Sequence, residues 1–276
     1  MKHQEFIMTA ADKQELFAQS WAPDTPTGLV CLVHGFGEHS GRYTHVAQAM
    51  VKADYAVIAF DQRGHGRTAG KQGFTPSYNL SLHDIDKLIS EGQKRFPHLP
   101  TFLYGHSMGG GMVLNYTLRY KPKLQGVIAT SPWLRLTTPP PAAVTGIARL
   151  IGSVWKGFTI TGKHENGILS RDPAVDEAHI ADPLTHSAIS AALFFGANDG
   201  GAWVLSQAAD FPLPLLLMHG DADKLTSFAA SQEFAQNAPA ATTTFKAWLG
   251  YYHETHNDIG KEEVIATIIS WMNEQL

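Results

Sequence analysis

The chain has 276 residues and a formal net charge of −4, a length that suits one large domain or one domain with an insertion. It contains no basic block of the kind that binds nucleic acid or an anionic membrane, and its one cysteine, Cys31, excludes a disulfide framework. Cys31 stands in an apolar run, so we expect a buried thiol. No signal peptide is recognisable and no apolar run approaches a membrane span of ~18 residues, so a cytoplasmic location is expected.

Apolar runs and alternating patterns predict a series of strands separated by amphipathic segments. Strands are expected over residues 5–10, 15–22, 28–35, 55–61, 101–106, 125–130, 213–220 and 242–249. Helices are expected over residues 42–53, 78–96, from Ser107 onward, near 226–236 and over 260–274. The first two strands form an antiparallel pair, whereas the later alternation of strand and helix is typical of a mostly parallel sheet covered by helices on both faces.

Residues 132–190 interrupt this alternation, with three consecutive prolines and no clean buried strand. We interpret them as a cap inserted into a core domain made of residues 1–131 and 191–276. A helix is expected around residues 141–156, where apolar residues recur at helical spacing. Two interpretations of that apolar stripe stay open: it packs onto the core domain, or it lines an apolar substrate tunnel.

The segment Gly105-His106-Ser107-Met108-Gly109 matches the G-x-S-x-G pattern between a predicted strand and a predicted helix. In such a nucleophile elbow a sharp turn exposes the serine oxygen above the edge of the sheet. A serine hydroxyl needs a base to accept its proton and a carboxylate to orient that base. The pattern therefore predicts catalysis only if these partners follow in the appropriate loops.

Two loops after later predicted strands supply the partners in the expected order, the acid first and the histidine second. Asp223 is the expected acid, because it lies three residues beyond Gly220, with Asp221 as the alternative. His253 is the expected base, with His256 as the alternative. Both loops leave the carboxyl ends of strands, where parallel sheets place their shared crevice.

Acyl transfer also needs donors for the oxyanion that forms when serine attacks a carbonyl. The backbone N–H of Met108, which follows the nucleophile, is one expected donor. The N–H of Phe36, between two glycines in the loop after an earlier strand, is the other.

Two further features have structural interpretations. The loop over residues 60–68 contains Gly64-x-Gly66 but lacks the phosphate-binding G-x-x-x-x-G-K-[ST] pattern, so we expect it to pack near the site with Asp61 bracing it. The 14 histidines show neither H-E-x-x-H nor paired Cys/His spacing. We therefore expect no metal and no cofactor.

Taken with these motifs, the chain resembles the monoacylglycerol lipase and lysophospholipase family of α/β-hydrolases. The resemblance covers most of the chain and depends on residues 34–43, 60–68, 105–112, 169–184, 214–226 and 251–258. It implies an α/β-hydrolase fold with a mostly parallel eight-stranded sheet flanked by helices and a helical cap insertion. It also implies a triad of Ser107, Asp223 and His253.

The same resemblance suggests that Glu38, Arg42 and His256 hold the polar glycerol end of a monoglyceride. For Glu38 and Arg42, an ion pair that fixes the oxyanion loop is the open alternative. The chain departs from the family at Phe36, where a small residue is commoner and where a ring would reshape the acyl pocket.

The expected activity is hydrolysis of monoacylglycerol-like or lysophospholipid-like esters through an acyl-enzyme intermediate. The main alternative is other chemistry on the same triad, namely that of a general carboxylesterase, a carbon–carbon bond hydrolase, a lactonase, an aminopeptidase or a perhydrolase. A binding protein that retains the fold is a further alternative. The expected partner is a small amphiphilic ester, and no nucleic acid is expected. The sequence leaves open a transient membrane contact through the cap, the acyl length and the oligomeric state.

Overall fold

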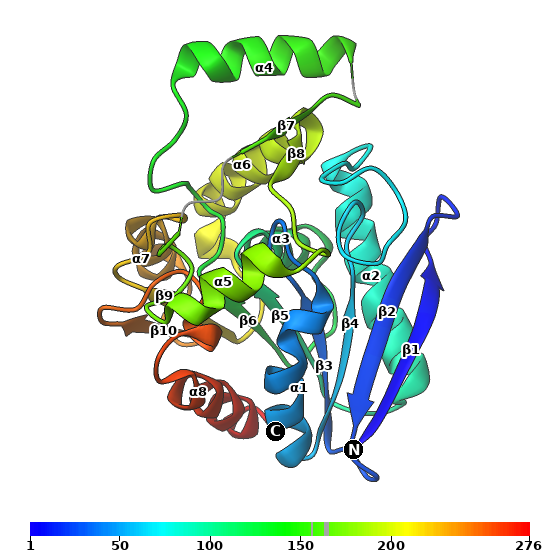
Figure 1. The fold of residues 1–276 in the computed structure, drawn as a ribbon. Coiled ribbons are helices and arrows are strands. Elements are labelled where there is room, and N and C mark those ends of the chain that lie inside the picture. Colours follow the sequence, from blue (N-terminus) through cyan, green and yellow to red (C-terminus); the bar gives the residue numbers. More distant parts are fainter. Residues whose placement is uncertain (156, 163–165) are drawn as a thin grey trace.

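An eight-stranded sheet runs through the centre of the computed structural model, which describes residues 1–155, 157–162 and 166–276 (Figure 1). The strand order is β1-β2-β4-β3-β5-β6-β9-β10, and β2 runs in the opposite direction to the other strands of this sheet. The strands are β1 (Lys2–Thr9), β2 (Glu15–Ala22), β3 (Gly28–Val33), β4 (Tyr55–Phe60), β5 (Thr101–His106), β6 (Gly126–Thr130), β9 (Leu215–Gly220) and β10 (Thr243–Trp248). Every residue of β3, β4, β5, β6 and β9 is buried, which explains their continuous apolar sequences.

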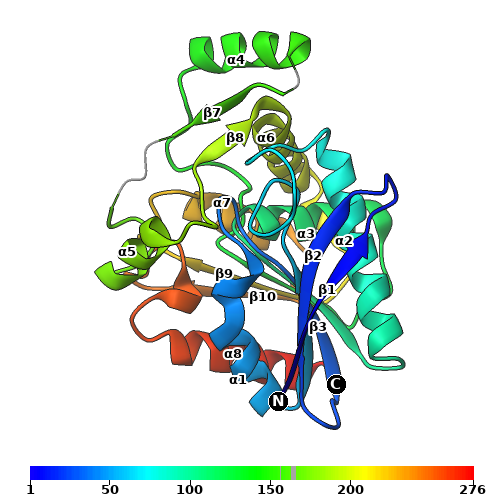
Figure 2. The same cartoon turned by 45° about the vertical axis from the view of Figure 1, so that its right-hand side comes forward.

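Helices cover both faces of this sheet, so the predicted α/β-hydrolase fold is confirmed (Figures 1 and 2). Buried side chains of α1 and α8 pack on one face, and those of α2, α3 and α7 pack on the other. The helices of the two layers are α1 (Thr44–Lys52), α2 (Tyr78–Arg95), α3 (Met108–Tyr120), α7 (Phe228–Asn237) and α8 (Lys261–Glu274). Three short 3₁₀ turns lie at Ser40–Tyr43, Ala208–Asp210 and Thr255–Asn257.

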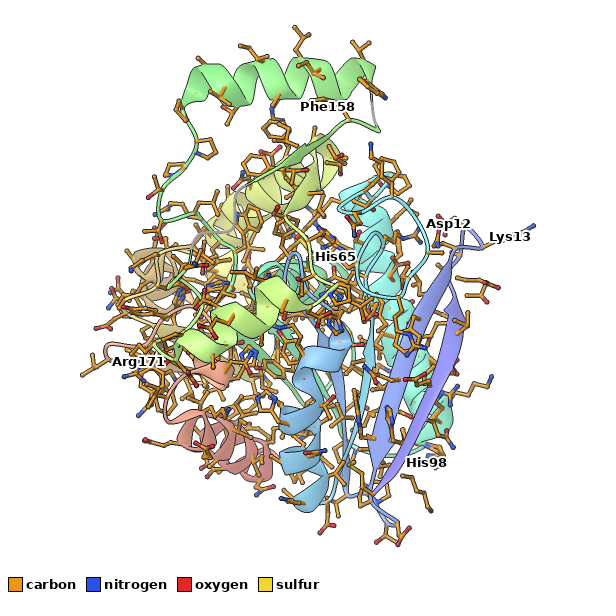
Figure 3. The ribbon with its side chains drawn as sticks, in the orientation of Figure 1. Asp12, Lys13, His65, His98, Phe158 and Arg171 are labelled. Carbon is orange, nitrogen blue, oxygen red and sulfur yellow. The ribbon has the colours of Figure 1, made fainter. Side chains whose placement is uncertain are left out.

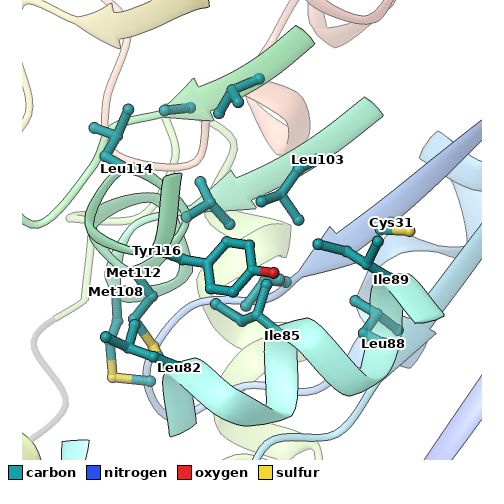
Figure 4. Close-up of a cluster of buried hydrophobic side chains, with 14 of the residues drawn as sticks. Cys31, Leu82, Ile85, Leu88, Ile89, Leu103, Met108, Met112, Leu114 and Tyr116 are labelled. Atoms are coloured by element: carbon teal, nitrogen blue, oxygen red, sulfur yellow. The ribbon is translucent and has the colours of Figure 1, made fainter. Parts of the chain in front are cut away.

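The larger core cluster joins α2 and α3 to the sheet (Figure 4). Leu82, Ile85 and Leu88 of α2 recur at helical spacing and face the strands. Cys31 of β3 is fully buried in this cluster, as predicted, and burial raises the pKa of its thiol. The core thus holds β3 and β5 rigidly, and both strands end at the site described below.

The segment over residues 132–190 and the helix that follows it lie over one end of the sheet (Figures 1 and 2). Their elements are α4 (Ala142–Val154), β7 (Thr159–Thr161), α5 (Pro173–Ala181), β8 (Ala188–Ser190) and α6 (Ala191–Ser206). The sequence predicted α4, although residue 156 of that expected helix lies outside the described residues. The pattern analysis did not anticipate α5, α6 or the two-stranded β7–β8 sheet. Three-residue strands and a helix that is apolar on most sides give little periodic signal.

Helix α4 contacts α6 at the far end of this segment, and most of its apolar stripe faces solvent (Figure 1). Val154 is 84% exposed and Ile147 is 61% exposed. Phe158 lies beneath α4, as Figure 3 shows. Most of the stripe is therefore not buried against the rest of the protein, and only part of it borders a cavity. Among the described residues, no helix is long and apolar enough to cross a membrane.

Candidate active site

The loops that carry the expected catalytic residues leave β3, β5, β9 and β10 at their carboxyl ends. These strands run parallel, so their ends meet at one edge of the sheet. Residues far apart along the chain are thereby brought into one crevice beneath the segment over residues 132–190.

Ser107 occupies the turn between β5 and α3, with a strained backbone at φ 54° and ψ −117°. Gly109 explains why this turn needs small residues. A Cβ atom at Gly109 would lie 2.3 Å from the carbonyl oxygen of Val33 and 2.4 Å from that of His34. The start of α3 thus packs directly on the end of β3, and this close approach lifts the serine side chain above the sheet.

Ser107, His253 and Asp223 form a continuous hydrogen-bonded chain. His253 Nε2 lies 2.8 Å from Ser107 Oγ, and His253 Nδ1 lies 2.7 Å from Asp223 Oδ2. An ionised carboxylate only accepts hydrogen bonds, so Nδ1 carries the proton and Nε2 is free to accept from the serine hydroxyl. The Ser131 hydroxyl donates to the backbone carbonyl of His253 (2.7 Å) and helps hold its loop.

Asp223 is held by a set of donors that the sequence analysis did not identify. His219 donates from Nε2 to Asp223 Oδ2 (3.0 Å), and Thr226 donates its hydroxyl to the same oxygen (2.9 Å). The backbone N–H groups of Leu225 and Thr226 donate to Oδ1 at 2.7 and 3.1 Å. In the sequence, the signal for these donors is weak: a histidine stands four residues before Asp223, at the end of a predicted strand.

These contacts shift the pKa values of the two groups in opposite directions. Burial alone would raise the pKa of Asp223, but His253 and the donated hydrogen bonds hold it well below its usual range. Burial alone would lower the pKa of His253, but the Asp223 carboxylate raises it above that of an ordinary histidine. The nearby Glu254 and Glu38 carboxylates increase the pKa of His253 further.

The alternative acid and base occupy other positions. Asp221 accepts a hydrogen bond from the Gly250 backbone (2.6 Å) and so ties the two loops together. His256 is fully buried, stacked on Tyr43 with ring centroids 4.8 Å apart, and it does not border the catalytic cavity. Burial lowers the pKa of His256 to about 3, which keeps its ring neutral. Within the described residues, its ring nitrogens have no hydrogen-bond partner.

The two expected oxyanion donors come from the residue that follows Ser107 and from a residue that borders the same cavity. Met108 is the first residue of α3, where a backbone N–H has no partner within the helix. Phe36 borders the same cavity as Ser107, and its ring meets His65 and His186 edge-on, each with centroids 5.8 Å away. Its ring therefore forms part of the cavity wall that also contains Ser107.

Neighbouring loops brace the loop that contains Phe36. Asp61 accepts hydrogen bonds from the backbone and hydroxyl of Ser40 (2.8 and 2.6 Å) and from the backbone of Arg67 (2.8 Å). This is the bracing role expected for Asp61. The backbone N–H of His186 donates to the carbonyl of Gly37 (3.0 Å), so the segment over residues 132–190 also holds this loop.

Glu38, Arg42 and Glu254 form a buried cluster near Ser107. Arg42 donates to Glu38 Oε2 (2.8 Å) and to both oxygens of Glu254 (2.7 and 2.8 Å). Glu38 Oε1 also accepts from the Gly35 backbone (2.5 Å) and from the Tyr43 hydroxyl (2.7 Å). Glu38 and Glu254 border the cavity, whereas Arg42 lies behind them. The sequence analysis did not identify Glu254.

A cavity of about 340 Å³ opens at Ser107 and His253. Its wall is polar at the carboxylates of Glu38 and Glu254 and mostly apolar elsewhere, although His179, His186, Ser187 and Thr226 also border it. The apolar wall consists of Phe36, Trp133, Leu136, Ile160, Ile168, Leu169, Ile189, Phe194 and Leu225. A second, almost wholly apolar cavity of about 210 Å³ lies under α4 and shares Ile160, Ile189 and Phe194 with the first. No group of three or more His, Cys, Asp or Glu side chains in the described part of the chain is arranged to hold a metal ion.

Comparison with protein families gives one match that covers most of the chain. Residues 24–260 match the family described as serine aminopeptidase, S33. A monoacylglycerol lipase from Mycolicibacterium smegmatis is 34% identical over 91% of this chain and 90% of its own length.

A solved structure and a longer relative extend this similarity. The crystal structure of the monoacylglycerol lipase of Paleococcus ferrophilus superposes with a TM-score of 0.87 at 32% identity, covering 95% of this chain and all of that chain. An uncharacterized abhydrolase domain-containing protein of Dictyostelium discoideum is 35% identical over 98% of this chain. The chain spans 29% of the length of that relative.

Proposed function

This chain belongs to the serine aminopeptidase S33 family of α/β-hydrolases and is a carboxylic ester hydrolase, and from this premise we propose that it cleaves monoacylglycerol-like esters by serine catalysis. The hydrogen-bonded chain from Ser107 through His253 to Asp223 is the observation that carries the proposal. It supplies a nucleophile, a base of the required tautomer and a carboxylate that orients the base.

In the acylation step, Ser107 Oγ attacks the ester carbonyl carbon while its proton passes to His253 Nε2. The backbone N–H groups of Phe36 and Met108 donate to the oxyanion of the tetrahedral intermediate. The intermediate collapses by breaking the bond between the acyl carbon and the alcohol oxygen, which takes the proton from His253. The Asp223 carboxylate stabilises the transient imidazolium.

Deacylation repeats these steps with water. A water molecule gives one proton to His253 as its oxygen adds to the acyl carbon. Collapse of the second intermediate breaks the bond to Ser107 Oγ, which recovers the proton from His253. The carboxylic acid leaves, and the mechanism requires no cofactor.

The cavity walls suggest how such an ester is oriented. The apolar wall and the adjoining cavity under α4 suit an acyl chain, since burying each methylene stabilises the complex by about 0.8 kcal/mol. The alcohol then lies toward Glu38 and Glu254. We assign Arg42 to holding these two carboxylates, which it reaches directly, and His256 to packing behind Tyr43.

Residues 132–190 act in this proposal as a cap over a core domain of residues 1–131 and 191–276. The exposed apolar side chains of α4, such as Ile147 and Val154, support a transient contact between the cap and a lipid surface. Such a contact would deliver a poorly soluble ester to the cavity beneath.

Labelling with a fluorophosphonate probe tests the nucleophile, since only an activated serine reacts rapidly. We expect wild-type protein to be labelled and to hydrolyse a series of monoacylglycerols from octanoyl to oleoyl. Ser107→Ala is expected to lose labelling and to lower kcat by about a millionfold with the fold intact, as circular dichroism would verify. Retained ester hydrolysis in Ser107→Ala would refute the proposal.

Assays of the same protein with aryl esters, lactones and aminoacyl amides compare the other reactions open to this triad. The proposal requires monoacylglycerols to give the highest kcat/KM. A higher value for an aminoacyl amide would instead favour an aminopeptidase.

A further inference from the structure

The charged groups that border the catalytic cavity are unbalanced. Glu38 and Glu254 are the only Asp, Glu, Lys or Arg side chains on its wall among the described residues. Arg42 offsets one of the two negative charges from behind. The cluster of Glu38, Arg42 and Glu254 therefore keeps one net negative charge where water is largely excluded.

This carboxylate pair lies close to the reacting atoms. A Cβ atom placed on Gly35 would lie 2.7 Å from Glu38 Oε1 and 3.1 Å from Ser107 Cβ, so one small residue separates the carboxylate from the nucleophile. Glu254 directly follows the catalytic histidine in the chain. The acyl chain requires the apolar walls, so the alcohol that leaves with the proton of His253 lies beside the carboxylates.

The positive charge of Arg42 is not placed where an anionic substrate could bind it. It donates to both carboxylates, and burial together with these bonds fixes it behind them. The pKa of Glu254 is held well below its usual range by Arg42, so the carboxylate stays ionised. A phosphate beside the pair would meet like charge at low dielectric, where electrostatic repulsion is strong.

We propose that the pair Glu38 and Glu254 makes the alcohol side of the site charge-selective, so that it accepts neutral or cationic alcohols and excludes phosphate-bearing ones. This inference rests on the proposed ester hydrolysis. It distinguishes two substrate classes that the sequence does not distinguish. The alcohol part of a monoacylglycerol is neutral, whereas that of a lysophospholipid carries a phosphate. It also predicts that the site hydrolyses acyl esters of a quaternary amino alcohol.

Three esters with the same acyl group provide the test: lauroylcholine, 1-lauroylglycerol and 1-lauroylglycerol 3-phosphate. Each is assayed below its critical micelle concentration, so that the charge of an aggregate surface does not contribute. We expect kcat/KM for the phosphate ester to be at least about tenfold below that of 1-lauroylglycerol, and lauroylcholine to match or exceed 1-lauroylglycerol. Equal rates for the phosphate and neutral esters would overturn the inference.

Salt separates the buried pair from the overall negative charge of the protein. At about 1 M salt the Debye length is about 3 Å, so repulsion from exposed charges is screened. We expect the discrimination against the phosphate ester to persist there. Its disappearance would assign the effect to the surface and contradict the proposal.

A variant removes the charge while keeping the shape of the side chain. Glu254→Gln leaves Arg42 paired with Glu38 and makes the cluster neutral, so we expect the phosphate ester to gain about tenfold relative to 1-lauroylglycerol. The control Glu262→Gln removes an exposed carboxylate on α8 and should leave the ratio unchanged. If Glu254→Gln does not fold, the comparison of the three esters with wild-type protein, at low and at high salt, still tests the proposal. Failure to hydrolyse any of the three esters would instead count against the proposed function.

Discussion

The carboxyl edge of the sheet and helix α4 are held in place in opposite ways. At the sheet edge, hydrogen bonds join Ser107, His253 and Asp223, and Asp223 also accepts from two side chains other than His253. Helix α4 carries apolar side chains that face solvent and contacts the rest of the protein mainly through α6. The proposed reacting groups are thus held by many hydrogen bonds, whereas the helix proposed to meet lipid is held mainly by its contacts with α6.

This difference has a physical basis. Proton transfer requires donors and acceptors at hydrogen-bond distance, so a small displacement is costly. An acyl chain makes non-directional contacts, and a helix can present apolar area to it without fixed geometry. Substitutions at the sheet edge should therefore change the rate of reaction, and substitutions on α4 should change access to aggregated substrate.

After loss of Ser107 itself, the largest effect is expected when the orienting carboxylate is neutralised. Asp223→Asn keeps the size of the side chain but no longer stabilises the His253 imidazolium, so kcat should fall by about 10³ to 10⁴. The same change should alter the pH profile. The base acts when neutral, so wild-type kcat/KM falls as the pH drops below the pKa of His253, which Asp223 raises.

In Asp223→Asn the fall in kcat/KM should move to lower pH, as measured with a soluble ester. Asp221→Asn is the matched control, because that carboxylate joins two loops without touching His253. A profile that stays in place in Asp223→Asn would show that Asp223 does not set the pKa of the base.

An intermediate effect on kcat is expected from a substitution in the oxyanion loop, which is the loop after β3 that contains Phe36 and Gly37. Gly37 has φ +72°, and a Cβ atom there would lie 2.3 Å from the carbonyl oxygen of His186. Gly37→Ala should therefore displace the adjacent Phe36 N–H and lower kcat by about 10- to 100-fold with little change in KM. Gly167 has nearly the same φ, +71°, with open space around it.

Gly167→Ala thus carries the backbone strain without the collision. If both alanine variants lose the same activity in steady-state assays, strain alone explains the loss and the oxyanion loop is not tightly constrained by the cap.

The smallest effect on stability is expected on α4. Val154→Ser should change the free energy of unfolding by less than about 0.5 kcal/mol, because that side chain is mostly exposed. Val127→Ala, in the buried strand β6, should lower it by about 2 kcal/mol. Urea unfolding measures both changes.

For activity, Val154→Ser should slow hydrolysis of oleoylglycerol in vesicles while leaving a short soluble ester unaffected. Equal loss on both substrates would contradict the assigned role of α4 and remove the contrast with the sheet edge.

The sequence determined the parts of this protein whose signal is local. Buried strands such as β3 and β4 are continuous apolar runs, and α1 and α2 repeat apolar residues at helical spacing. The glycines around Ser107 and the order of the Asp223 and His253 loops also predicted which side chains would meet, because parallel strands end at a common edge.

Only the tertiary structure decided the choices that depend on contacts between distant segments. It joins Asp223 and His253, and neither Asp221 nor His256, to Ser107 through hydrogen bonds among the described residues. It brings His219 to Asp223 and adds Glu254 to Glu38 and Arg42. It also turns the apolar stripe of α4 outward, although its periodicity equally suits a packed helix. Periodicity records the spacing of side chains along one element, whereas orientation and charge at a site are set by what other elements bring against it.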